Sequence, residues 1–158
     1  MGQTRKARAA EEDWPKRGEI YLTALDPTVG REIKKTRPAL VIQNDTSNRY
    51  SAVTMVAPIT STVRLPLSPL HVLLPPGSAT GLSVASVAVF NQLRAVDRRR
   101  LIKKLGHVDD LVMGQADEAI KAAFGLSSPG LGPEVKSPTV TQAISESTGK
   151  FKTRRYEP

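Results

Sequence analysis

Short apolar runs separated by polar turns follow one another along most of the chain and predict a small β-rich domain. The apolar positions predict strands over residues 18–25, 38–43, 52–59 and 70–74, with one or two more between 84 and 96 and a last one over 101–108. The run over 38–43 is short, apolar and partly β-branched, which is typical of a buried strand. Polar clusters at 44–48 and 75–81 predict turns, and the charged residues 97–100 predict a corner, with Asp97 capping a single helical turn.

A helical pattern follows these strands. Asp109 is a good N-cap and Asp110 places negative charge in the first turn, where it favours the helix dipole. Gly125 is a natural C-terminal stop. Between them, apolar residues recur at steps of three and four and form one stripe, namely Val112, Ala116, Ala119, Ile120 and Ala123. The order of elements predicts a mainly β fold, a strongly bent sheet or small barrel, with a C-terminal α-helix.

The two ends of the chain differ from this domain in composition. Residues 1–17 are polar and charged with no periodic apolar pattern, and we interpret them as a flexible lead-in to a domain over 18–126. Residues 127–158 are rich in Ser, Thr, Pro, Gly and charge, which predicts a disordered tail. An alternative is that the basic and aromatic segment 151–156 folds on a partner.

Charge and composition restrict the chemistry. The net charge is +8, and residues 18–126 contribute +4 of it, which fits a polyanionic partner such as nucleic acid. The chain has no cysteine, hence no disulfide and no thiolate site. No apolar run approaches the roughly 20 residues of a membrane span, and no apolar segment follows the basic residues near the N-terminus. We therefore expect a cytoplasmic protein that does not bind membranes.

The usual catalytic motifs are missing from the sequence. It contains no Walker loop, no HExxH or GxSxG pattern and no carboxylates at metal-ligand spacing. An enzyme here would work with Arg, Lys, Thr, Ser and isolated carboxylates. RNA cleavage needs no more than that set, because the substrate supplies its own 2′-hydroxyl nucleophile and a guanidinium can stabilise the charge that builds on phosphorus. We expect neither a metal nor a cofactor.

Several residues are candidates for this chemistry, and each has a purely structural alternative. Arg37 joins a basic loop to the buried strand, but it could instead pair with Asp26 or Glu32. Thr60 ends the third strand, where its hydroxyl could simply cap the next turn. Glu32 could act as a base, or it could pair with Lys34. The remaining candidates are Lys34 and Lys35 for phosphate attraction and Asn44, with its neighbours Asp45 and Asn48, for base contacts or a turn.

Three segments resemble the MazF/PemK family of toxin endoribonucleases. These are Thr-Arg-Pro-Ala-Leu-Val-Ile at 36–42, Pro-Ile-Thr at 58–60 and Gln-Leu-Arg-Ala-Val-Asp at 92–97, and the likeness extends over residues 18–126. It implies an SH3-like β-barrel of the MazF/CcdB type with a C-terminal helix. It also implies a type II toxin that cuts single-stranded mRNA without a metal, leaves 2′,3′-cyclic phosphate and 5′-hydroxyl ends, and inhibits translation and growth.

The resemblance also implies roles for individual residues and partners. Arg37 matches the family's catalytic arginine and Thr60 its catalytic partner, which Ser61 could partly replace, while Glu32 lies where the family often has an acidic residue. Gln92 and Arg94 share one face of their strand and could contact RNA or a partner subunit. The family forms homodimers that are inhibited by a MazE-like antitoxin, acidic and partly disordered, which could fold across the basic groove.

Two other functions compete with this one. Toxins of the CcdB family use the same barrel to poison DNA gyrase by protein binding, and fold alone does not separate them. They depend on a Trp-Gly-Ile chain end, whereas the only tryptophan here is Trp14 and the sequence ends in Arg-Tyr-Glu-Pro. A non-catalytic RNA-binding barrel is a third possibility, and an aromatic content of 4% leaves it few stacking platforms.

Overall fold

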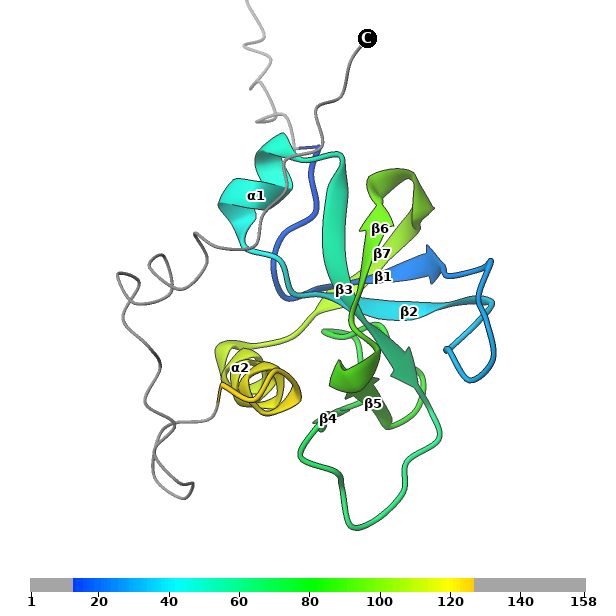
Figure 1. Cartoon of the computed structure of the whole chain (residues 1–158), viewed down its shortest axis with the longest axis vertical. Coiled ribbons are helices and arrows are strands. Elements are labelled where there is room, and N and C mark those ends of the chain that lie inside the picture. The colour runs from blue at the N-terminus through cyan, green and yellow to red at the C-terminus, as the bar shows by residue number, and fades with distance from the viewer. Residues whose placement is uncertain (1–12, 127–158) are drawn as a thin grey trace, which may run out of the picture. The chain divides into compact units, whose positions relative to one another are not determined.

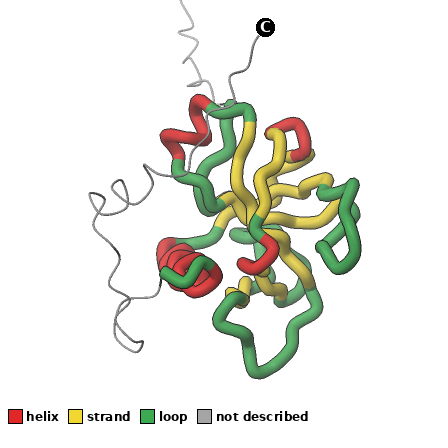
Figure 2. Tube along the Cα trace, in the orientation of Figure 1, coloured by secondary structure: helices red, strands yellow, loops and turns green. Residues whose placement is uncertain are grey.

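The computed structural model describes residues 13–126, so the predicted tail and the first twelve residues of the predicted lead-in lie outside the described residues. Within this range the chain forms strands, two α-helices and two short 3₁₀-helices (Figures 1 and 2). In chain order they are β1 (Glu19–Ala24), β2 (Thr36–Val41), α1 (Asp45–Tyr50), β3 (Val53–Thr60), β4 (His71–Leu74), β5 (Ser86–Val89), η1 (Phe90–Gln92), β6 (Arg94–Asp97), η2 (Arg98–Arg100), β7 (Leu101–His107) and α2 (Asp110–Ala123).

The strands form one bent antiparallel sheet in the order β4-β5-β3-β2-β1-β7. The long strand β3 organises it, because its first half pairs with β6 and its end pairs with β5. No pairing between described residues joins β4 to β7, so the sheet is barrel-like but does not close. The prediction of a mainly β fold with a C-terminal helix is confirmed, and the strands lie within a few residues of their predicted positions.

Apolar side chains fill both faces of this sheet, to very different extents. On β2, Leu40 belongs to a large core that lies between the sheet and α2, while Ala39 and Val41 point the other way. We call the first cluster the helix-side core; it includes Ile59 and Phe90, which are 2% and 1% exposed. The second, the small core, contains only Ala39, Val41, Val56 and Val96 as buried members, with Tyr21 and Leu101 packed against it.

Helix α2 covers the large core as its sequence pattern predicts. Asp109 caps the helix by accepting a hydrogen bond from the Val112 backbone N–H at 2.9 Å. Ala116 and Ala119 are buried in the helix-side core, and Gly125 follows the helix in the left-handed region with φ of 68°. No helix within residues 13–126 has the length and apolar character of a membrane span.

One element differs from its prediction. The polar cluster after β2 forms the short helix α1 rather than a turn. Asn44 is its N-cap and accepts a hydrogen bond from the Ser47 N–H at 2.8 Å. Asn48 is fully buried, where its side chain bonds the Gln43 backbone, the Gln43 amide and the Thr54 hydroxyl. A polar network therefore anchors the helix where an apolar stripe would normally be expected.

The last residues of the predicted lead-in lie against the domain. Arg17 donates a backbone hydrogen bond to the Asp45 carboxylate at 2.7 Å. Its guanidinium donates to the Ile42 carbonyl and pairs with Asp117 of α2. Arg17 thus links the start of β1 to α1 through its backbone N–H and to α2 through its side chain.

Two glycines allow a close crossing near the end of β7. A Cβ atom at Gly106 would collide with the backbone of Ala79 and Thr80, and one at Gly81 would collide with the backbone of Leu105. His107 donates its backbone N–H to the Ala79 carbonyl at 2.8 Å. The connection between β4 and β5 therefore lies directly against β7, which only residues without a side chain permit.

Candidate active site

The hairpins of the sheet bring Arg37 and Thr60 together. Arg37 is the second residue of β2 and pairs with Thr23 of β1, while the β2–β3 register pairs Ala39 with Pro58. Continuing that register by two residues places Thr60 opposite Arg37. Because cross-strand partners share a face of a sheet, both side chains lie on the face of the small core, just beyond its edge.

The Arg37 side chain is half-buried, and one of its nitrogens makes a hydrogen bond within the protein. Its Nε donates to the Lys34 carbonyl at 3.0 Å. Within residues 13–126 its two terminal nitrogens make no hydrogen bond, and no ion pair joins Arg37 to Asp26 or Glu32, so the structural alternative for this residue is wrong. A guanidinium held by Nε with both terminal nitrogens unpaired is arranged to bind two oxygens of one anion.

Thr60 caps the next turn and still has a proton to donate. Its hydroxyl oxygen accepts a hydrogen bond from the Thr62 backbone N–H at 3.2 Å. The capping alternative predicted from the sequence is therefore present. It uses only a lone pair of the hydroxyl, whose own O–H remains available to a ligand. Ser61 follows and is exposed.

The loop between β1 and β2 carries the acidic candidate and two of the basic ones, and its own side chains brace it. Asp26 accepts from the Thr28 hydroxyl and from the Lys35 backbone N–H, both at 3.0 Å. Glu32 is exposed and accepts from the Val29 N–H at 3.1 Å. Among the described residues no ion pair joins Glu32 to Lys34. Glu32 therefore closes a turn of the loop, with its carboxylate facing solvent.

Gln92 and Arg94 hold this loop to the sheet. The Gln92 side-chain carbonyl accepts from the Ile33 backbone N–H at 2.7 Å. Arg94 donates from Nη1 to the Leu25 carbonyl at 2.9 Å. Gln92 ends η1 and Arg94 starts β6, so side chains from a distant part of the chain hold the loop by bonds to its backbone.

Arg100 is a member of this arrangement that sequence reasoning missed. Its Nη1 donates to the Ala24 carbonyl at 3.0 Å and to the Asp26 carbonyl. The sequence showed it only as part of a basic corner at 98–100. No local signal indicates the contact, because its two partners lie more than 70 residues away along the chain.

A cleft of about 440 Å³ opens between the β1–β2 loop and the segment around η1. Pro58, two residues before Thr60 on the same face, lines it together with the loop and the segment around η1. The other lining residues are Glu32, Ile33, Asn91, Gln92, Leu93, Arg94 and Ala95. The sequence candidates Glu32, Gln92 and Arg94 therefore meet at one cleft.

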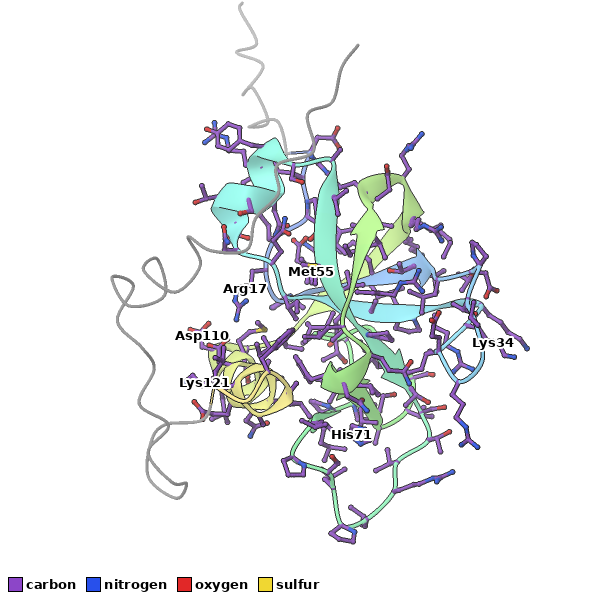
Figure 3. All side chains as sticks on the ribbon, viewed as in Figure 1. Arg17, Lys34, Met55, His71, Asp110 and Lys121 are labelled. Carbon is purple, nitrogen blue, oxygen red and sulfur yellow. The ribbon has the colours of Figure 1, made fainter. Side chains whose placement is uncertain are left out.

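Asn44 lies away from this group. It follows the opposite end of β2, seven residues beyond Arg37, which corresponds to about 20 Å along an extended strand. Its side chain caps α1. Lys34 and Lys35 are exposed on the β1–β2 loop, and Figure 3 shows Lys34 on the opposite side of the view from α2 with its labelled Asp110 and Lys121.

Basic side chains outnumber acidic ones around the site. Within residues 13–126 no group of three or more His, Asp or Glu side chains is placed to hold a metal ion. Beyond the loop, Asp97 caps η2 and bonds both the side chain and the backbone N–H of Arg99, which lowers the pKa of the Asp97 carboxyl to about 2. That carboxylate is thus fixed as an anion within the arginine-rich corner.

Known proteins resemble this chain in both sequence and fold. A family model described as the PemK-like, MazF-like toxin of type II toxin-antitoxin systems matches residues 16–124. Endoribonuclease EndoA of Bacillus subtilis is 40% identical over 111 residues, which cover 70% of this chain and 95% of that protein.

Solved structures extend the likeness to the fold. MazF of Deinococcus radiodurans is 25% identical with a TM-score of 0.61, over 71% of this chain and 97% of that one. A mycobacterial endoribonuclease in complex with its cognate antitoxin is 23% identical with a TM-score of 0.60, over 73% of this chain and 99% of that one, and shows the fold alone. The chain therefore belongs to the MazF/PemK family of toxin endoribonucleases, the toxins of type II toxin–antitoxin systems.

Proposed function

We propose that this toxin cuts single-stranded RNA at a short sequence motif by a metal-independent reaction centred on Arg37 and Thr60. The observation that carries the proposal is the shared position of these two residues at one end of β2 and β3, with the terminal nitrogens of Arg37 unpaired in the described structure. The RNA supplies the nucleophile, and the protein supplies alignment and charge.

Arg37 stabilises the transition state in this mechanism. As the 2′-hydroxyl attacks phosphorus, negative charge builds on the non-bridging oxygens, and a planar guanidinium can donate to two of them at once. The bond from Nε to the Lys34 carbonyl fixes the plane of the group before substrate arrives. The bond from phosphorus to the 5′-oxygen then breaks and the 5′-oxygen takes a proton from water, giving a 2′,3′-cyclic phosphate and a 5′-hydroxyl end.

Thr60 donates one further hydrogen bond to a phosphoryl oxygen. A threonine hydroxyl is too weak an acid to serve as the proton donor, so its role is electrostatic. The Thr62 N–H that bonds its oxygen orients the hydroxyl. Ser61, the next residue, takes over part of this role when Thr60 is replaced.

Glu32 is the proposed general base that removes the 2′-hydroxyl proton. It lines the cleft and its carboxylate is exposed. One of its oxygens accepts from the Val29 N–H and holds the side chain in the loop. The second oxygen makes no hydrogen bond within residues 13–126 and is the one that meets the substrate.

The remaining candidates bind RNA rather than react with it. Lys34 and Lys35 attract phosphates from the loop. Gln92 and Arg94 line the cleft and present their remaining polar groups to a base or phosphate. Asn44, at the far end of β2, contacts only nucleotides distant from the cleaved bond.

The biological setting follows from the family. The toxin acts as a homodimer in the cytoplasm, where RNA cleavage inhibits translation and growth. A MazE-like antitoxin, acidic and partly disordered, folds across the basic groove and covers Arg37. A mycobacterial endoribonuclease of this fold in complex with its cognate antitoxin supports such a partner. Residues 18–126 form the toxin domain in this proposal.

The test uses end-labelled single-stranded RNA of mixed sequence, excess EDTA and purified wild type, Arg37→Ala and Thr60→Ala. We expect cuts at a short motif with cyclic-phosphate ends. Losing the guanidinium should lower the rate by roughly 100-fold or more and losing the hydroxyl by less. Arg49→Ala, which removes an exposed arginine from α1, serves as the matched control. Intact RNA with folded wild-type protein would reject the mechanism and direct the next assay to gyrase.

A further inference from the structure

A second, larger cleft lies at the opposite end of β1 from the candidate active site. Its volume is about 920 Å³. It forms where the segment before β1 passes over β7 and η2. Its lining residues are Asp13, Trp14, Pro15, Lys16, Glu19, Tyr21, Arg98, Arg99, Leu101 and Lys104. None of them belongs to the mechanism above.

Two aromatic rings line this cleft in a chain that has few. Trp14 is the only tryptophan of the sequence, and it is half-buried in the cleft wall with the Lys16 ammonium over its ring. Tyr21 lies on β1 beside the small core. Aromatic faces combined with cations are what proteins use to stack the bases of single-stranded nucleic acids.

Hydrogen bonds fix the Glu19 carboxylate in the cleft, and an ion pair with Lys104 neutralises its charge. The Glu19 side chain is 12% exposed, and its carboxylate accepts from the Lys104 ammonium at 2.6 Å, the Lys16 backbone N–H at 2.8 Å and the Tyr21 hydroxyl at 3.0 Å. The outermost cation is Arg99, whose side chain is 90% exposed. A ligand that enters therefore meets the Trp14 ring with the Lys16 ammonium over it and the exposed Arg99 guanidinium, whose Nε and Nη2 pair with Asp97, while the buried Glu19 charge is paired with Lys104.

The three arginines of η2 connect this cleft to the candidate active site. Arg100 donates hydrogen bonds to carbonyls at the end of β1, where the β1–β2 loop begins. Arg98 bonds the Asp13 and Ser51 carbonyls at the cleft. Arg99 lies between them and points to solvent. The arginines of η2 thus lie between the β1–β2 loop and the cleft that contains Trp14.

We propose that this cleft binds a nucleotide of the RNA that flanks the cleaved bond, with its base on Trp14 and its phosphate at Arg99. The inference rests on the proposed nuclease function and adds a second RNA subsite to it. Four basic residues against two acidic ones favour a polyanion over a peptide, and a ring face accepts any base, so the subsite adds affinity without adding sequence preference.

Trp14 allows a direct test, because all tryptophan fluorescence of the full chain comes from this cleft. The probe is a mixed-sequence pool of 2′-O-methyl RNA oligonucleotides, which bind but lack the attacking hydroxyl. We expect saturable quenching of Trp14 that weakens with added salt. Oligonucleotide binding, followed by the anisotropy of an end label, should be roughly 5- to 100-fold weaker for Trp14→Ala and nearly normal for Trp14→Phe, which keeps a stacking ring.

A matched pair of charge variants tests the phosphate contact. Arg99→Ala should weaken binding and lower the slope of log affinity against log salt by about one. Lys103→Ala, which removes a cation from an exposed position of β7 outside the cleft, should leave the Trp14 signal unchanged. Melting curves of all four variants verify that the fold is kept.

The outcomes separate the two proposals. Normal cleavage and normal oligonucleotide binding in Trp14→Ala, with no change in wild-type fluorescence, would overturn the subsite and leave the nuclease intact. Absence of any RNA binding by wild type would overturn both. A fluorescence response to a polyglutamate peptide but not to RNA would overturn the subsite in favour of an acidic protein partner.

Discussion

The two faces of the sheet are built by different physical means. On the side of α2, thirteen buried residues within 13–126 form the helix-side core, and all of them are apolar. On the other face only four buried residues form a small core. Around that small core, side chains of η1, β6 and η2 bond the backbone at the end of β1 and in the β1–β2 loop, through Gln92, Arg94 and Arg100.

This contrast separates stability from function within a single domain. Apolar burial is non-directional and supplies most of the folding free energy. Hydrogen bonds from side chains to backbone contribute less to stability, but they fix position and direction. The helix side therefore keeps the sheet folded, while the guanidinium and amide contacts hold the loop that orients Arg37. Variants in the helix-side core should therefore lose mainly stability, while variants of the loop contacts should lose mainly RNA cleavage.

The largest effect is expected from Phe90→Ala. This side chain is 1% exposed in the helix-side core, so its removal leaves a cavity and should cost about 3–5 kcal/mol of unfolding free energy. Urea denaturation followed by circular dichroism would measure the loss. Val96→Ala in the small core is the comparison and should cost clearly less, since fewer methyl groups are removed. Equal losses would show that the two faces contribute equally to stability.

Gln92→Met should lower RNA cleavage more than it lowers stability. Methionine has a similar length but no amide, so the bond to the Ile33 N–H is lost at a cost of about 1 kcal/mol. The β1–β2 loop would then be held less firmly and Arg37 less well oriented. We expect RNA cleavage to fall by roughly 10-fold or more, because small misplacements of catalytic groups are costly. Unchanged kcat and KM with the expected loss of stability would show that the loop contact is not needed for catalysis.

The smallest effect concerns Asp97 and is visible only in acid. Its bonds to the side chain and backbone N–H of Arg99 lower the pKa of the carboxyl from the ordinary 3.8 to about 2 in the folded protein. The charged form therefore stabilises the fold above pH about 4, and this contribution is lost as the pH falls toward 2. Asp97→Asn should melt at a slightly lower temperature than wild type at neutral pH, with the difference vanishing at pH 2.

Most of the fold could be predicted because its signals are local. The apolar strand β2 and the helix stripe of α2 carry their periodicity within a few residues, and Asp109 and Gly125 mark the helix ends directly. α1 could not be predicted in this way. Its anchor is Asn48, a polar residue satisfied by Gln43 and Thr54, and a buried polar contact leaves no periodic pattern in the sequence.

The candidate site was predictable only in part. Arg37 and Thr60 became candidates mainly through the family resemblance, and the β2–β3 register, which pairs Ala39 with Pro58, extends toward both of them at one end of these strands. The contact from Arg94 to Leu25 spans 69 residues and that from Arg100 to Ala24 spans 76. Such contacts depend on how the sheet bends, which no run of residues encodes by itself.

The close crossing at Gly81 and Gly106 has a consequence for self-association. β7 is a terminal strand of the sheet, and an open strand edge is a template on which another chain can add a strand. The connection after β4 lies against the end of β7, where the Ala79 carbonyl accepts a hydrogen bond from the His107 N–H. A side chain at position 106 would push this cover away and expose the edge. We therefore expect a side chain at position 106 to favour aggregation through the end of β7 as well as to disturb the fold.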